Sequence, residues 1–343
     1  FNGQVLAMLL VGAICTPLIP SMTAKAILGV TVASGVATAM GYPNYSNGRY
    51  ALFMAAWFGF GETAPAFVNG SIFGYTLLGA LPEGVTCTYV EWFLAMIPWL
   101  IIILIGGFVI IKLLYRPEQS GALTKEYAAE HYKRLGKLQG KELQSALILA
   151  GAVILWVLES VLGIPAAVTA LGAGLLCFAL GILDVKEIAT APKWSIVIFL
   201  GGVLALGSVF SGAGIDIWLQ TLIAPLFEKI NNTYLAALVI MVMVVVLRLI
   251  LASFSATIII MMAVLTPVAS TIGLSPFIIG ILVYTVENSW FVRYQNTTYT
   301  TCFECVKDTI EYRGTVKASF AYIVLCIIAC LVSIPYWSAL NYI

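Results

Sequence analysis

The sequence has very little charge. Only 10% of its 343 residues are Asp, Glu, Lys or Arg, whereas 61% are hydrophobic, and the formal net charge is +1. A soluble domain of this length needs far more polar surface, so the composition predicts an all-α membrane protein that crosses the bilayer several times. There is also no basic face to hold a phosphate backbone, which excludes nucleic acid as a partner.

Histidine and the motifs of hydrolytic enzymes are almost absent. The only histidine, His131, lies in a polar stretch, so a histidine proton relay or a His-based metal site inside the membrane is excluded. No His-Glu-x-x-His, Gly-x-Ser-x-Gly or pair of membrane aspartates occurs, which argues against an intramembrane enzyme. Cys302-x-x-Cys305 has metal-site spacing, but no second pair or nearby histidine accompanies it. We therefore expect neither a bound metal nor a cofactor.

The sequence begins at Phe1 inside an apolar segment and shows no charged n-region or small-residue cleavage site of a signal peptide. We expect it to be a fragment that lacks the first membrane segments. The whole would be an integral multi-pass protein of a bacterial inner (plasma) membrane, in contact with membrane lipid.

A polar interruption at residues 20–25 (Pro-Ser-Met-Thr-Ala-Lys) separates two apolar runs, 5–19 and 26–40. Each run is too short to span a bilayer, since a spanning helix needs about 20 residues. Non-helical backbone at membrane depth survives only where protein or a wet cavity satisfies it. The pattern predicts a re-entrant hairpin over residues 1–40. The alternative is one long kinked helix with Lys25 reaching outward.

The same order of segments occurs twice. After the first hairpin, an apolar stretch at 50–81 is broken at 59–65 (Gly-Phe-Gly-Glu-Thr-Ala-Pro), and an unbroken run follows at 91–115. Later, a second hairpin at 234–271 has the polar tip 253–257 (Ser-Phe-Ser-Ala-Thr), the run 276–286 breaks at Glu287, and 315–335 is unbroken. Paired broken segments in two halves indicate the binding site of a secondary transporter.

These observations divide the chain into four parts. We expect a first repeat at 1–115, a cytoplasmic amphipathic arm at 116–142, scaffold spans at 143–233, and the second hairpin, broken span and last span at 234–343. The two hairpin tips would each begin a half-helix, whose free N–H groups and hydroxyls suit a small oxyanion.

Charged residues near the tips and breaks are candidates for the transport site. Lys25 and Arg293 supply positive charge for an anion, and arginine can grip a carboxylate with two parallel bonds. Pairing of Arg293 with Glu287 or Glu304 is the structural alternative. Glu62 with Thr63, and Glu287, lie at equivalent breaks and could hold a sodium ion or carry a proton. The alternative for each acid is a salt bridge to Lys25 or Arg293.

Several segments resemble the divalent anion/sodium symporter family, closest to its dicarboxylate and citrate exchangers. Residues 20–25 resemble its Pro-Ser-Asn-Thr-Ala-Arg signature, 193–206 its Trp…Phe-Gly-Gly-Gly-Leu-Ala-Leu segment, and 253–257 its second Ser-Asn-Thr tip. The resemblance implies a homodimeric, inverted-repeat elevator transporter that moves di- or tricarboxylates by sodium symport or anion exchange. Substrate would lie between the tips, against Ser21, Met22, Thr23, Lys25, Ser253, Phe254, Ser255, Thr257, Arg293, Asn296, Thr297 and Thr298.

Two departures from that signature bear on the substrate. Met22 and Phe254 stand where the family has asparagines that contact substrate carboxylates. A less polar or monovalent carboxylate would suit such a site, and Lys25 could occupy a cation site and favour exchange over sodium symport. The runner-up function is a cation/proton antiporter with Glu62 and Glu287 as ion carriers.

The polar arm provides a test of orientation. Residues 112–141 contain seven of the seventeen Lys and Arg residues, so the positive-inside rule places them in the cytoplasm. A cysteine introduced at Ala129 should resist an impermeant thiol reagent added outside intact cells. Ready labelling from outside would reverse the topology.

Overall fold

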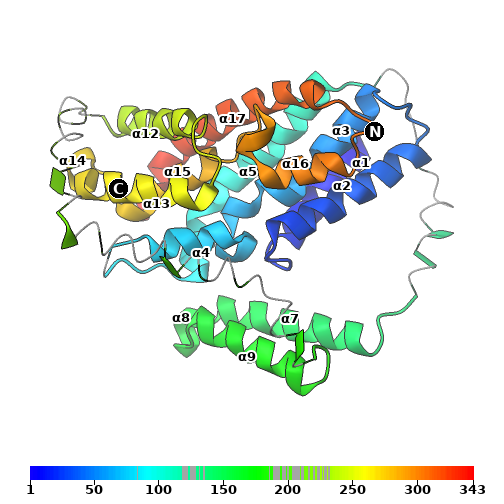
Figure 1. Ribbon diagram of the computed structural model, residues 1–343, viewed down its shortest axis with the longest axis horizontal. Helices are drawn as coiled ribbons and strands as arrows, with labels where there is room; N and C mark the ends of the chain where they lie inside the picture. The colour runs from blue at the N-terminus through cyan, green and yellow to red at the C-terminus, as the bar shows by residue number, and fades with distance from the viewer. Residues whose placement is uncertain are drawn as a thin grey trace.

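The protein is described here from a computed structural model of residues 1–343 (Figure 1). The structure describes all residues except 83, 118–122, 124–128, 131, 134, 135, 185, 188–193, 195–197, 199, 200, 203–208, 210, 211, 215, 216, 219, 220, 222–224, 226, 228, 229 and 231. The described part consists of helices joined by turns and loops and contains no strand, as the composition predicts.

The first repeat consists of a helix–break–helix hairpin, a broken span and a continuous helix. The first helix of the hairpin ends at Cys15 and the second begins at Met22, with Pro20 between them. The predicted helix–break–helix segment is therefore confirmed, and the alternative of a single kinked helix is wrong. The broken span unwinds through a π-helical turn and two short 3-10 turns before it becomes helical again. The elements are α1 (Asn2–Cys15), α2 (Met22–Ala39), α3 (Asn47–Ala56), η1 (Trp57–Glu62), η2 (Ala64–Ala66), η3 (Val68–Gly70), α4 (Ile72–Gly79) and α5 (Tyr89–Leu114).

The second repeat has the same order of elements. Its hairpin breaks between residues 247 and 254, and its broken span ends at Val286 and restarts at Thr297. The elements are α12 (Thr233–Leu247), α13 (Phe254–Leu265), η5 (Thr266–Val268), α14 (Ala269–Ile272), α15 (Pro276–Val286), η6 (Arg293–Gln295), α16 (Thr297–Glu304) and α17 (Tyr312–Ala339). Figure 1 shows α1 and α2 at one end of the view and α12 and α13 at the other, with α5, α15 and α17 between them.

A helical hairpin from the predicted scaffold lies beside the first repeat. It consists of α7 (Lys141–Val157), α8 (Glu159–Leu162) and α9 (Ala166–Ala179). Oε1 of Glu159 accepts a hydrogen bond from the Ala166 N–H at 3.0 Å, and Oε2 accepts one from the Tyr89 N–H at 3.4 Å. Glu159 therefore caps α9 and joins it to the start of α5. About half of the predicted arm at 116–142, and much of the predicted scaffold after residue 184, fall outside the described residues.

The two continuous helices form the centre of the molecule. Among the described helices, three are long and apolar enough to cross a membrane, namely α2, α5 and α17. Helices α5 and α17 run antiparallel, because Trp337 Nε1 donates to Ala95 O at 2.7 Å and Tyr115 Oη donates to Gly314 O at 2.8 Å. Each repeat thus contributes one full-length helix against which its broken elements pack.

A close backbone contact fixes the first broken span against the first hairpin. A Cβ atom on Gly12 of α1 would lie 2.2 Å from the carbonyl carbon of Gly59, and one on Gly59 would lie 2.5 Å from Met8 O. Only glycine allows this approach, because any side chain would have to displace backbone. The contact sets the position of the π-helical turn, which ends at Glu62.

This contact predicts a stability difference between two glycines. Gly12→Ala should lower the free energy of unfolding by about 1–3 kcal/mol, as overpacking does. Gly35 is the matched control, since it is a helical glycine of α2 with no atom within 4 Å of an added Cβ. Gly35→Ala should leave stability unchanged or raise it by up to about 1 kcal/mol. Thermal unfolding in detergent measures both, and equal melting temperatures would contradict the contact.

Candidate functional site

Four half-helices begin at the two tips and the two breaks, and each begins with a polar cap. The side chains of Ser21, Ser71, Ser253 and Asn296 accept hydrogen bonds from the first free N–H groups of α2, α4, α13 and α16, at 2.8–3.3 Å. In apolar surroundings these donors would otherwise be unsatisfied. Short polar residues at the predicted tips therefore have a local structural role, which is why the chain can be non-helical there.

Each tip packs against the broken span of the other repeat. Thr23 Oγ1 of α2 lies 3.2 Å from Thr298 Oγ1 of α16. On the other side, the Phe254 ring of α13 lies 4.8 Å, between centroids, from the Phe73 ring of α4. Thr23 of the first tip thus meets Thr298 directly, while Phe254 lies in an aromatic contact with the first repeat.

Lys25 is buried at the first tip. Its side chain is fully shielded from solvent, and Nζ donates to Gly70 O at 2.6 Å. Gly70 ends the unwound part of the first broken span, and Asn69 beside it donates to Pro17 O at 2.9 Å. These two bonds fasten the first tip to the first break. Lys25 forms no salt bridge with Glu62 within the described residues.

A second buried cation, Arg248, lies at the second tip. Its Nε donates to Glu287 O at 2.9 Å, Nη1 donates to Leu251 O at 2.7 Å, and Nη2 donates to Gln295 O. The guanidinium carbon also lies 4.2 Å from the centre of the Phe254 ring. Arg248 therefore fastens the second tip to the second break, as Lys25 does in the first repeat.

The two cations bond to corresponding carbonyl groups, although Lys25 lies in the second helix of its hairpin and Arg248 at the end of the first helix of its own. Gly70 and Gln295 each lie eight residues after the acid of their break, Glu62 and Glu287, and each directly precedes the residue that caps the next half-helix. Both carbonyl groups accept a hydrogen bond from the cation of their own hairpin. The repeat is thus visible in side-chain contacts as well as in the order of helices.

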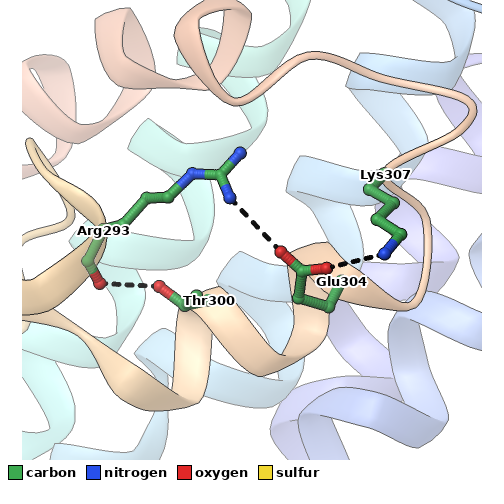
Figure 2. Close-up of polar contacts among 4 residues, drawn as sticks. All are labelled: Arg293, Thr300, Glu304 and Lys307. Carbon is green, nitrogen blue, oxygen red and sulfur yellow. Dashed lines mark hydrogen bonds and ion pairs between the residues drawn. The ribbon is translucent and has the colours of Figure 1, made fainter.

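Arg293 lies away from this buried set. Its Nη1 is 3.3 Å from Glu304 Oε1, and the two side chains are 58% and 43% exposed. Figure 2 shows that Glu304 also pairs with Lys307 and that Thr300 donates to the Arg293 carbonyl oxygen. Arg293 therefore pairs with Glu304, one of the two alternatives that the sequence left open. The other acid, Glu287, interacts with the charge of Arg248 instead.

The acids of the two breaks are fully buried in different surroundings. Glu62 Oε2 accepts a hydrogen bond from Asn288 Nδ2 at 2.7 Å, so the first break contacts the second. Neither carboxyl oxygen of Glu287 has a hydrogen-bond partner among the described residues, although Arg248 lies close enough to interact with its charge. Thr63 Oγ1 donates to Gly59 O at 2.6 Å and lies 2.8 Å from Thr16 Oγ1.

The remaining predicted residues differ in exposure. Ser21, Ser253 and Thr297 are exposed, and Thr23 is half-buried. The side chains of the others are largely buried; these are Met22, Phe254, Ser255, Thr257, Asn296 and Thr298. Thr257 Oγ1 donates to Ser253 O at 3.0 Å, within its own helix. An anion that reaches the tips would meet the exposed serines first, beside apolar Met22 and Phe254.

Sequence reasoning did not identify Arg248, Asn288 or Asn69. Arg248 lies at the end of a long apolar run, so the sequence places it at membrane depth, as it does Lys25. A charged residue at membrane depth is a candidate functional residue, and Arg248 could have been identified on this ground. No sequence feature indicates that Asn288 reaches Glu62, 226 residues away. Such contacts depend on how the two repeats pack.

Comparison with known proteins supports the reading as a membrane transporter. The family model of the sodium:sulfate symporter transmembrane region matches residues 4–343. One relative is an uncharacterized transporter of Haemophilus influenzae, 25% identical over 195 residues. The match covers 55% of this chain and 39% of that relative, so the chain spans well under half of the relative's length.

The two arginines predict opposite mutational effects. Arg248→Ala removes three bonds of a buried cation and should destabilise the protein by roughly 3–5 kcal/mol, as expected when one partner of a buried charged contact is lost. Arg293→Ala removes an exposed pair and should change stability by less than about 1 kcal/mol. Thermal unfolding of both variants tests the assignment. An Arg293→Ala variant as unstable as Arg248→Ala would contradict it.

Proposed function

Because the chain belongs to the sodium:sulfate symporter family, we propose that it is part of a secondary active transporter of small organic anions. The substrate is held between the two hairpin tips and is released to either side by alternating access. The repeated hairpins and broken spans support this proposal, since paired discontinuous helices form the binding sites of many secondary transporters.

The observation that carries the proposal is the pair of buried cations. Lys25 and Arg248 each reach from a tip to a break, and their hydrogen-bond partners are neutral carbonyl groups. Neutral partners do not cancel a full charge in low dielectric, so a buried cation favours a nearby anion. Glu287 is the acid that interacts with Arg248. In the described part of the chain no carboxyl group interacts with Lys25, whose titratable neighbour is the Cys15 thiol. An anion at the tips would supply the missing negative charge.

The tips favour a carboxylate with an apolar part. The Oγ atoms of Ser21 and Ser253 accept N–H groups of their own helices, which leaves each hydroxyl hydrogen free to donate to a carboxylate oxygen. Met22 and Phe254 follow these serines directly and place apolar side chains, 6% and 5% exposed, where further donors could stand. We infer that the substrate is a monocarboxylate or a weakly polar dicarboxylate.

The coupling mode follows from the same cations. A sodium ion needs several oxygen ligands to replace its water, and backbone carbonyl groups at helix breaks are suitable ones. At both breaks carbonyl groups of this kind already accept hydrogen bonds from Lys25 or Arg248. Anion exchange without sodium is therefore our proposal, in a homodimeric elevator-type assembly.

Counterflow into liposomes tests both points. Liposomes that contain the protein and are loaded with unlabelled small carboxylates should accumulate labelled carboxylate equally well whether the external buffer contains sodium or potassium. Lys25→Ala should reduce the exchange rate by roughly 10- to 150-fold, since a hydrogen bond to a charged group contributes about 1.5–3 kcal/mol. Lys317 is the matched control, because its Nζ also donates to a carbonyl oxygen, Leu114 O at 2.9 Å, but at an exposed position.

Three results would count against this function. Strict dependence of uptake on sodium would overturn exchange but not anion transport. Equal losses in Lys25→Ala and Lys317→Ala would remove Lys25 from the site. Sodium or proton flux without any carboxylate would favour the cation/proton antiporter instead.

A further inference from the structure

Helices α5 and α17 form a packed pair with one buried side and one exposed side. The Phe58 ring lies 5.5 Å, between centroids, from the Tyr322 ring of α17, and a Cβ atom on Gly107 of α5 would lie 2.8 Å from the same Phe58 ring. Both helices therefore bury the side that faces Phe58. Between the two helices, a Cβ atom on Gly106 would collide with the side chain of Leu325, so the pair is tightly packed.

The exposed side of this pair is apolar along most of its length. On each helix the exposed apolar residues are spaced four apart, which places them on one face. They are Ile101, Ile105, Val109 and Leu113 on α5, and Phe320, Val324, Ile328 and Val332 on α17. Both helices are long and apolar enough to cross a membrane. These two stripes of side chains therefore suit contact with lipid acyl chains.

Positive charge gathers where α5 ends and α17 begins. Lys112 and Arg116 continue the apolar stripe of α5, three residues after Val109 and Leu113, and Arg313 lies two turns before the stripe of α17 starts. The side chains of Lys112, Arg116 and Arg313 are exposed. Within the described residues none of the three forms a salt bridge, so their charges are available to a partner.

Lys317 joins these two helix ends. Its Nζ donates to Leu114 O at 2.9 Å and lies 4.4 Å from the centre of the Tyr115 ring. Tyr115 Oη in turn donates to Gly314 O at 2.8 Å. The cations of α5 and the cation of α17 therefore belong to one surface.

This positive charge is present at only one end of the pair. At the other end, residues 79–91 and 336–343 contain no Lys or Arg. Glu311 directly precedes α17 and can offset one cation, whereas the next acid, Asp308, lies beside Asn44, whose Nδ2 donates to the Asp308 carbonyl oxygen at 3.4 Å. Because α5 leads directly into the basic arm, the positive-inside rule places this end at the cytoplasmic interface.

We propose that the exposed side of α5 and α17 binds an anionic phospholipid of the cytoplasmic leaflet. Lys112, Arg116 and Arg313 hold the phosphate group, and the acyl chains lie along the two apolar stripes. A guanidinium can donate two parallel bonds to phosphate oxygens, and an ammonium adds a point charge. A zwitterionic lipid carries its own cation beside the phosphate, so a surface of three cations favours a lipid with net negative charge. This inference does not depend on what the protein transports.

Lipid titration of the purified protein in detergent tests the proposal. Phosphatidylglycerol should raise the melting temperature more than phosphatidylcholine with the same acyl chains. Lys112→Gln combined with Arg313→Gln should raise the phosphatidylglycerol concentration at half-maximal effect by about 25-fold, since each cation near a lipid surface contributes about fivefold. The matched control, Arg293→Gln with Lys307→Gln, removes the same charge from exposed residues that pair with Glu304, and should shift this concentration less than about twofold.

A charge-keeping variant separates electrostatic docking from other effects of substitution. Lys112→Arg combined with Arg313→Lys should bind phosphatidylglycerol as the natural protein does, and loss of binding there would overturn the proposal. Equal effects of the two lipids on the natural protein would overturn it as well. Equal losses in the test and control variants would assign the attraction to net charge instead of this surface. A rise in melting temperature with inorganic phosphate as large as with phosphatidylglycerol would exclude the acyl chains, and with them a lipid as the ligand.

Discussion

The requirement that every backbone polar group be satisfied within the membrane governs this structure. Four half-helices begin among apolar elements, and the N-terminus of each half-helix exposes N–H groups that lipid cannot bond. The side chains of Ser21, Ser71, Ser253 and Asn296 satisfy these donors. Lys25 and Arg248 donate to carbonyl groups in the unwound parts of the broken spans. The broken helices exist because these few polar side chains replace the bonds that a continuous helix would make.

The same contacts create the conditions for binding an anion. A cation that donates to a backbone carbonyl group satisfies that acceptor, but its positive charge is not neutralised. Two such cations therefore hold the tips in place and also leave positive charge in a region of low dielectric, next to exposed serine hydroxyls. Under the proposed function, stability of the fold and attraction for the anion come from the same side chains, so a substitution of Lys25 or Arg248 affects both.

The breaks were predictable from the sequence, whereas the contacts across them were not. Apolar runs of about 15 residues cannot span a bilayer, and this length limit alone locates the tip near Ser21. Composition also indicates the break at Glu62, where two glycines and a proline interrupt an apolar stretch. By contrast, Arg248 near the second tip and Arg293 near the second break are both single arginines, and only packing shows that Arg293 faces Glu304 at the surface whereas Arg248 is buried.

The two repeats hold their tips with unequal strength. Arg248 bonds to two carbonyl groups of the break, those of Glu287 and Gln295, and Gln295 and Tyr294 add bonds to the backbone of residues 248 and 249. At the first tip, Lys25 bonds to Gly70 and Asn69 bonds to Pro17. A guanidinium is a rigid fork, whereas an ammonium is a point charge on a flexible stem. Since bonds to charged groups contribute about 1.5–3 kcal/mol each, separating tip from break costs less in the first repeat than in the second.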